Sequence, residues 1–131
     1  MKRILGGTLL VILVLLASGC AKPPVLELSY FYASHCNDCG DVEKKLLGMN
    51  DRLKSIGAAY RVEPVLHNLM TDRGFEAFEA ALESHGVGLS SRHAPLLLAG
   101  EAWFYGEDID SALEDLEGGV LPPGVLPSSS R

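Results

Sequence analysis

Hydrophobic and polar positions along the chain predict alternating strands and helices from residue 25 onward. The stretch 25–32, VLELSYFY, is short and rich in aromatic and apolar residues, which predicts a buried strand. After it, apolar residues recur at steps of three and four, the spacing of one helix face, and Gly57 closes this helix. The helical positions are Val42, Leu46, Met49, Leu53 and Ile56.

A second strand and a second helix continue the pattern. Residues 58–66, AAYRVEPVL, predict a strand, in which Pro64 favours an edge position or a strand end. The helix after it has Thr71 or Asp72 as its N-cap and ends near Gly86. Its apolar face is formed by Phe75, Phe78, Ala81 and Leu82.

A hairpin and a last helix follow. The segment 95–106, PLLLAGEAWFYG, has two apolar runs around Gly100 and Glu101, which predicts a tight antiparallel turn. Residues 107–119 predict a helix with an acidic first turn that stops at two glycines. The apolar face of this helix consists of Ile109, Ala112, Leu113 and Leu116.

The order β-α-β-α-β-β-α predicts an α/β fold, a four-stranded mixed sheet flanked by helices. The first β-α-β unit requires a right-handed parallel crossover. The last two strands form an antiparallel pair. We expect one domain over residues 25–118, since a chain of 131 residues fits one domain. The Pro- and Ser-rich residues 119–131 predict a flexible, unpacked tail.

The charge of the chain argues against a nucleic-acid partner. The formal net charge is −6, and removal of Lys2 and Arg3 with the N-terminus leaves nine basic against seventeen acidic residues. A nucleic-acid-binding protein needs a basic footprint that neutralises phosphates. The sequence also has no polybasic run that would hold it on anionic lipid.

The first nineteen residues have the layout of a secretory signal peptide. A basic start precedes the apolar run 4–16, whose thirteen residues are fewer than the roughly 20 of a spanning helix. LASGC, residues 16–20, resembles the lipobox of bacterial lipoproteins, although Ala17 stands where Leu is usual. The resemblance implies a diacylglyceryl thioether on Cys20 and a lipid anchor on the extracytoplasmic side of a membrane in the bacterial cell envelope. The alternative is a plain signal peptide with an incidental cysteine.

A lipid-modified Cys20 cannot join a disulfide, so Cys36 and Cys39 remain as an isolated pair. Residues 20–24 would then be the lipidated tether, stiffened by proline. Its four residues after the cysteine reach about 13 Å, which keeps the domain close to the membrane surface.

Cys36 and Cys39 form a C-x-x-C pair between the first strand and the first helix. Two cysteines three residues apart at a helix start can reach the separation that a disulfide requires. The free N–H groups and the partial positive charge there favour a thiolate. This predicts Cys36 as the nucleophile and Cys39 as the thiol that resolves a mixed disulfide.

FYASHCNDC, residues 31–39, resembles the strand and C-x-x-C segment of thioredoxin-fold proteins, and the element order matches the glutaredoxin-like core. HAPLLLAGEAWFYG, residues 93–106, is similar to the cis-proline hairpin of that family. The resemblance, which covers about residues 25–118, implies a cis Pro95 and an Ala94 whose backbone binds the substrate chain. It also implies a thiol–disulfide oxidoreductase that needs no cofactor besides the Cys36–Cys39 disulfide. Its partners would be extracytoplasmic protein thiols and disulfides, and a membrane thiol carrier as electron source or sink.

Three departures from thioredoxin concern the tuning of the pair. His35 replaces the tryptophan before the first cysteine, Asn37-Asp38 replaces Gly-Pro, and Tyr30 lies near the place of the buried acid. At about 6 Å, Asp38 repels a thiolate by roughly 0.7–3 kcal/mol, which raises the thiol pKa by about 0.5–2. A protonated His35 would offset part of this. A strongly oxidising potential is therefore not implied, and we favour a reductase or isomerase.

Two alternatives remain for the cysteines. Cys36, Cys39 and His35 could bind copper or zinc with His67 or His93, although structural zinc takes four ligands and the chain has no second C-x-x-C. The bond could also be a structural disulfide in a non-catalytic module, although so short a loop stabilises little. We expect no metal at the site.

Overall fold

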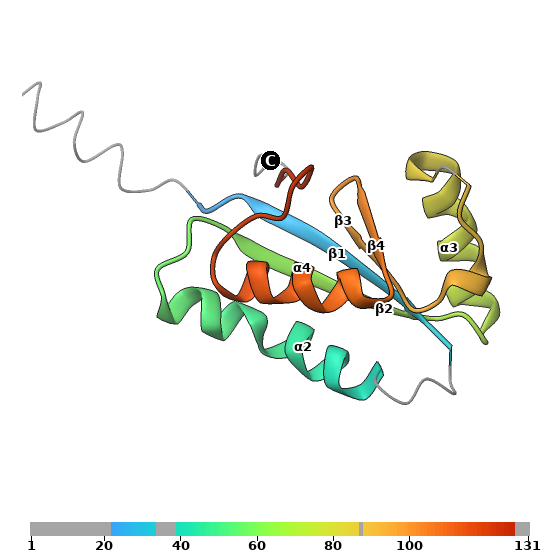
Figure 1. Cartoon of the computed structure of the whole chain (residues 1–131), viewed down its shortest axis with the longest axis horizontal. Coiled ribbons are helices and arrows are strands. Elements are labelled where there is room, and N and C mark those ends of the chain that lie inside the picture. Colours follow the sequence, from blue (N-terminus) through green and yellow to red (C-terminus); the bar gives the residue numbers. More distant parts are fainter. Residues whose placement is uncertain (1–21, 34–38, 87, 128–131) are drawn as a thin grey trace, which may run out of the picture.

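The computed structural model of the protein describes residues 22–33, 39–86 and 88–127. In this part of the chain, a four-stranded sheet carries helices on both faces (Figure 1). This confirms the predicted α/β class, the mixed sheet and the order of elements. The elements are β1 (Val25–Tyr32), α2 (Cys39–Ser55), β2 (Arg61–Asn68), α3 (Asp72–His85), the 3-10 helix η2 (Ser91–His93), β3 (Leu96–Ala99), β4 (Ala102–Tyr105) and α4 (Glu107–Glu117).

The strand β1 has a neighbour on each side, because the strand order is β2-β1-β3-β4. It pairs in parallel with β2 along its whole length, beginning with Val25 opposite Arg61. β3 runs antiparallel to β1, with Leu96 opposite Phe31, and β4 completes the predicted hairpin. β2 is thus an edge strand, which confirms the position predicted from Pro64.

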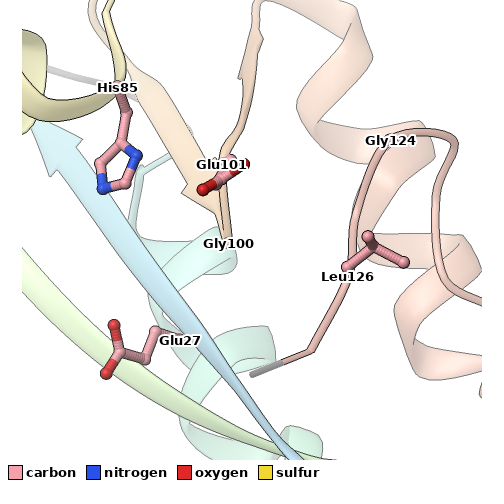
Figure 2. Close-up of a pocket in the computed structure, with 6 residues that line it drawn as sticks. All are labelled: Glu27, His85, Gly100, Glu101, Gly124 and Leu126. Atoms are coloured by element: carbon pink, nitrogen blue, oxygen red, sulfur yellow. The ribbon is translucent and has the colours of Figure 1, made fainter. Parts of the chain in front are cut away.

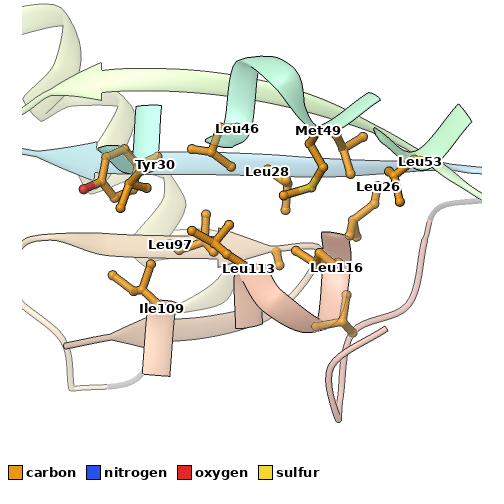
Figure 3. Packing of buried hydrophobic residues seen from close by; sticks show 14 of the residues in the cluster. Leu26, Leu28, Tyr30, Leu46, Met49, Leu53, Leu97, Ile109, Leu113 and Leu116 are labelled. Atoms are coloured by element: carbon orange, nitrogen blue, oxygen red, sulfur yellow. The ribbon is translucent and has the colours of Figure 1, made fainter. Parts of the chain in front are cut away.

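Side chains of β1 alternate between two hydrophobic clusters, one on each face of the sheet. Leu26, Leu28 and Tyr30 belong to the larger cluster, which α2 and α4 cover (Figure 3). Phe31 belongs to the smaller cluster, to which α3 contributes Phe78. The predicted faces of α2 and α4 are confirmed at the buried residues Val42, Leu46, Met49, Leu53, Ile109, Ala112, Leu113 and Leu116.

Two side chains predicted to face the core are exposed instead. Ile56 is 53% exposed, because α2 ends one residue earlier and the chain turns away at Gly57, whose φ is +66°. Phe75 is exposed in the first turn of α3. Thr71 caps this helix as predicted, and its hydroxyl accepts a first-turn N–H at 3.1 Å. Met70 before the cap is also exposed, so Met70 and Phe75 occupy the two positions of a hydrophobic staple.

The second strand begins at Arg61, not at residue 58 as predicted, and it runs two residues further. The preceding residue, Tyr60, is held by α4, because its hydroxyl donates to the carbonyl oxygen of Leu116 at 2.9 Å. At Val62, the side-chain amide of Asn50 in α2 donates to the backbone carbonyl and accepts the backbone N–H, each at 2.8 Å. The amide thereby covers the outer edge of β2, where an edge strand would otherwise expose its backbone groups.

The residues after α4 pack against the fold as far as residue 127, which contradicts the expectation of an unpacked tail. Val125 is 3% exposed and belongs to the larger cluster. The carbonyl oxygen of Leu126 lies 3.1 Å from the place that a Cβ would take at Gly100, whose φ is +60°. The hairpin turn therefore needs glycine both for its backbone conformation and for the approach of this segment. Proline content indicated disorder, but the buried side chains of Pro122 and Val125 anchor the segment.

Replacing Val125 by alanine should lower the free energy of unfolding by about 1–2 kcal/mol, because it removes two buried methyl groups. The matched control is Leu126→Ala at the next position, which is 80% exposed and where the change should stay within about 0.5 kcal/mol. Urea unfolding followed by the fluorescence of Trp103, the single tryptophan, measures both. Equal effects of the two substitutions would contradict the packing of this segment.

Candidate functional site

Cys39 is the member of the predicted C-x-x-C pair that the structure describes, and it is the first residue of α2. Its side chain is 7% exposed and belongs to the larger cluster. Cys39 is disulfide-bonded. The chain contains two other cysteines, Cys20 and Cys36, and both lie outside the described residues. The remaining predicted residues of this segment lie outside them as well: His35, Asn37 and Asp38.

The position of Cys39 confirms the prediction that it lies at or inside the first turn of the helix. A sulfur there is close to the free N–H groups and the positive end of a 17-residue helix. Both features stabilise a thiolate relative to a thiol. Because Cys39 is almost fully buried, a large substrate cannot easily reach it. This sulfur is therefore better suited to resolve a mixed disulfide than to make the first attack.

The peptide bond between Ala94 and Pro95 is cis, as predicted for Pro95. β3 begins at the next residue, Leu96, which lies opposite Phe31 in the antiparallel pairing with β1. One step further along this register, Pro95 lies level with Tyr32, the last residue of β1. The cis bond is thus at the end of the sheet where the chain leaves β1 for α2 (Figure 1).

Several elements meet at this end of the sheet, which we call the Cys39 end. β2 finishes there, because its last residue pairs with the last residue of β1. β4 also finishes there, because its last residue pairs with the first residue of β3. The Cys39 end is defined by Tyr32, Cys39, Asn68, Pro95 and Tyr105.

Tyr30 lies on the sheet face that packs under α2, in the same cluster as Cys39. Its ring is fully buried and stacks on Tyr32, with 5.8 Å between the ring centroids and an interplanar angle of 19°. The place predicted for the buried acid of thioredoxin contains a phenol and not a carboxyl group.

The two histidines that the sequence suggested as extra metal ligands make other contacts. The ring of His93 lies against Tyr105 of the Cys39 end, with 5.8 Å between the ring centroids. His67 stacks on Phe31, with 4.8 Å between centroids, on the sheet face that α3 covers. His93 accepts the backbone N–H of Ser90 through Nδ1 at 3.1 Å in η2. Among the described residues, no group of three or more His, Cys, Asp and Glu side chains is placed to hold a metal ion.

A cavity of about 340 Å³ lies on the other face of the sheet, and no pattern in the sequence predicted it (Figure 2). It adjoins a second cavity of about 270 Å³, because both are lined by Glu27, His85 and Gly100. Gly100 donates its N–H to the carbonyl oxygen of Glu27, near the start of β1. These cavities are thus remote from the Cys39 end. The remaining lining of the larger one is Glu101, Gly124 and Leu126.

Comparison of the chain with models of protein families, with curated proteins and with solved structures finds no match in any of the three. A search of the described residues for membrane-spanning helices finds none that is long and apolar enough.

The stability of the protein should depend on the protonation of His67. Burial lowers the pKa of His67 from its ordinary value of 6.5, so the unfolded chain binds this proton more readily than the folded one. The contribution is fully present above about pH 6.5 and is lost as the pH falls through the folded pKa. His67→Phe keeps a ring beside Phe31 but cannot be protonated. Urea unfolding between pH 7.5 and 5 should therefore favour the variant increasingly, and a constant difference would contradict this.

Proposed function

We propose that this chain is a membrane-anchored, extracytoplasmic thiol–disulfide oxidoreductase with a thioredoxin-like fold and Cys36–Cys39 as its redox couple. The observation that carries the proposal is Cys39, a buried and disulfide-bonded cysteine that opens the helix after β1. The cis bond at Pro95, at the same end of the sheet, supports the resemblance to the thioredoxin fold. The order of strands and helices supports it as well.

In the reductive direction, the Cys36 thiolate attacks one sulfur of a substrate disulfide, and the other substrate sulfur leaves as a thiolate. The Cys39 thiolate then attacks Cys36 Sγ in the mixed disulfide and displaces the second substrate sulfur. Two electrons pass to the substrate, whose two sulfurs take up two protons, and the Cys36–Cys39 disulfide forms. A membrane thiol carrier reduces this disulfide and so restores the dithiol. Oxidation of a substrate dithiol is the same sequence in reverse.

Ala94 and Pro95 are the proposed contact for the substrate chain. Both are half-buried and close to the last residue of β1. The N–H of Ala94 donates to the carbonyl oxygen of Ser91 at 3.2 Å, which leaves its own carbonyl oxygen to accept from a substrate backbone. An extended segment of a protein next to its disulfide has such an N–H. This supports protein disulfides as the substrate class.

The direction of electron flow depends on the charges around Cys36. Asp38 raises the thiol pKa by its negative charge and opposes the helix terminus. In the underlying cluster, Tyr30 stands at the place predicted for the buried acid of thioredoxin. A disulfide is strongly oxidising when its reduced pair is stabilised as a thiolate, and Asp38 weakens that stabilisation in this pair. We therefore propose the reductase or isomerase direction.

The location of the protein follows from its N-terminal segment. We propose that Cys20 is lipid-modified and holds the domain at the extracytoplasmic face of a membrane in a bacterial cell envelope. The described chain begins at Lys22 and enters β1 at Val25, at the end of the sheet opposite Cys39 (Figure 1). The start of β1 and Cys39 therefore lie at opposite ends of the domain, which supports a site directed toward proteins outside the membrane.

Replacing Cys36 by serine should abolish the reduction of insulin disulfides, because the attacking thiolate is lost. Cys39→Ser should allow the attack but trap the mixed disulfide. The control is Cys20→Ser, which should keep the activity and lose the membrane anchor. A disulfide that resists mild reductant in the parent would indicate a structural role, and stoichiometric binding of Cu or Zn by the reduced pair would indicate a metal protein.

The reduction potential of the Cys36–Cys39 pair, measured in glutathione buffers, should lie below about −220 mV. A value above about −150 mV would contradict the proposed reductase or isomerase direction.

Asp38→Asn should lower the pKa of the Cys36 thiol by about 0.5–2, because it removes a negative charge near the thiolate. The pH dependence of the alkylation rate of the reduced protein measures this. Glu43→Gln is the matched control, an equal loss of charge on the exposed surface of α2, and it should change the pKa less. Equal effects of the two substitutions would show that Asp38 exerts no specific influence.

A further inference from the structure

A cavity of about 560 Å³ lies at the end of the sheet opposite Cys39, where α2 ends and β2 begins. We call it the basal cavity. In Figure 1 this region is the side where the described chain enters β1. Neither the candidate site nor its chemistry uses it. The basal cavity is lined by Pro23, Asn50, Leu53, Lys54, Gly57, Ala58, Tyr60 and Arg61.

The lining of the basal cavity combines two cations with apolar surface. Lys54 and Arg61 belong to it, and no carboxylate does, although the whole chain has a net charge of −6. Burial raises the pKa of Tyr60, and the negative charge of the nearby Asp115 raises it further. For an anion to bind, the positive charges of Lys54 and Arg61 must therefore outweigh the negative charge of Asp115. Since they are seven residues apart in sequence, only the fold brings them to one cavity.

Exposed apolar side chains lie next to the basal cavity. Ile56, which the sequence placed in the core, is 53% exposed, and Val120 is 57% exposed. Gly119, the residue before Val120, lies against Ile56, because a Cβ at Gly119 would be 3.2 Å from Ile56 Cδ1 and 3.6 Å from the Cβ of Ala58 in the lining. This end of the domain therefore presents bulky aliphatic side chains beside a cationic cavity, a combination that suits the interface of a membrane.

The N-terminal segment joins the fold at this same place. Pro23 lines the basal cavity, and the exposed Lys22 precedes it. The preceding residues include the thirteen-residue apolar run and Cys20. From Cys20 to Pro23 the chain spans about 10 Å at most, so a membrane that holds Cys20 is within reach of the cavity.

We propose that the basal cavity binds the headgroup of an anionic phospholipid from the membrane that anchors the chain. Lys54 and Arg61 pair with the phosphate. Pro23 and Ala58 contact the glycerol and the first acyl carbons, while Ile56 enters the interface. Bound in this way, the domain is held with the Cys39 end directed away from the bilayer. This inference rests on the anchoring part of the proposed function and not on its redox part.

The test uses the full chain, purified from the membranes of expressing cells and reconstituted in two kinds of vesicle, phosphatidylcholine alone and phosphatidylcholine with phosphatidylglycerol. Amide hydrogen exchange of residues 53–61 is the readout. Exchange should slow by about tenfold or more when phosphatidylglycerol is present, because each basic side chain near an anionic surface contributes roughly fivefold to binding. The double variant Lys54→Glu with Arg61→Glu should lose this protection.

A matched double variant controls for net charge. Lys44→Glu with Arg73→Glu reverses the same number of exposed cations outside the basal cavity, and it should keep the protection. Equal exchange in both vesicles, or equal loss of protection in both variants, would overturn the proposal. A full chain that does not associate with vesicles would overturn the anchor together with the lipid site. Insulin reduction by the same samples tests the redox proposal separately, so the two failures are distinguishable.

Discussion

The structure depends on the burial of β1 on both faces and both edges. A strand in this position must find a hydrogen-bonding partner on each side and an apolar layer above and below. β2 and β3 supply the edges, and the two hydrophobic clusters supply the layers. Leu26, Leu28 and Tyr30 require α2 and α4 on one face, and Phe31 requires α3 on the other. Burial of this apolar surface is the main force that holds the helices on the sheet.

The candidate site is a consequence of this arrangement. Parallel pairing of β1 with β2 forces the chain to return along the sheet, and α2 is that return. Its first residue, Cys39, must therefore lie where β1 ends. The antiparallel pairing of β3 brings Pro95 to the same end by its register with β1. A helix N-terminus and the turn before β3 thus meet through strand pairing, without any direct sequence proximity.

The same pairing gives the two ends of the domain different surfaces. Helix α2 begins at Cys39 and runs the length of the sheet to the basal cavity, where Lys54 and Arg61 join exposed aliphatic side chains. If the proposed anchor and redox pair are correct, one end of the domain serves the membrane and the other serves the substrate. The distance between them is then set by the lengths of β1 and α2.

Local periodicity in the sequence was sufficient to predict much of the fold. It predicted all eight residues of β1, the buried face of α2, the hairpin at Gly100, the edge position of Pro64 and the place of Cys39 at the start of α2. These features depend on the spacing of apolar residues and on glycine and proline, whose preferences act within a few residues.

Other features depend on contacts between residues that are distant in sequence, and these became visible in the folded chain. The start of β2 depends on Asn50 and on the bond from Tyr60 to α4, which no pattern within the strand reveals. The packing of Val125 depends on the space that α4 and the sheet leave open. Ile56 fits the helical period but lies beyond the end of the helix, so its exposure follows from where the chain turns. The basal cavity exists because the segment 50–61 meets Pro23, which is distant from it in sequence.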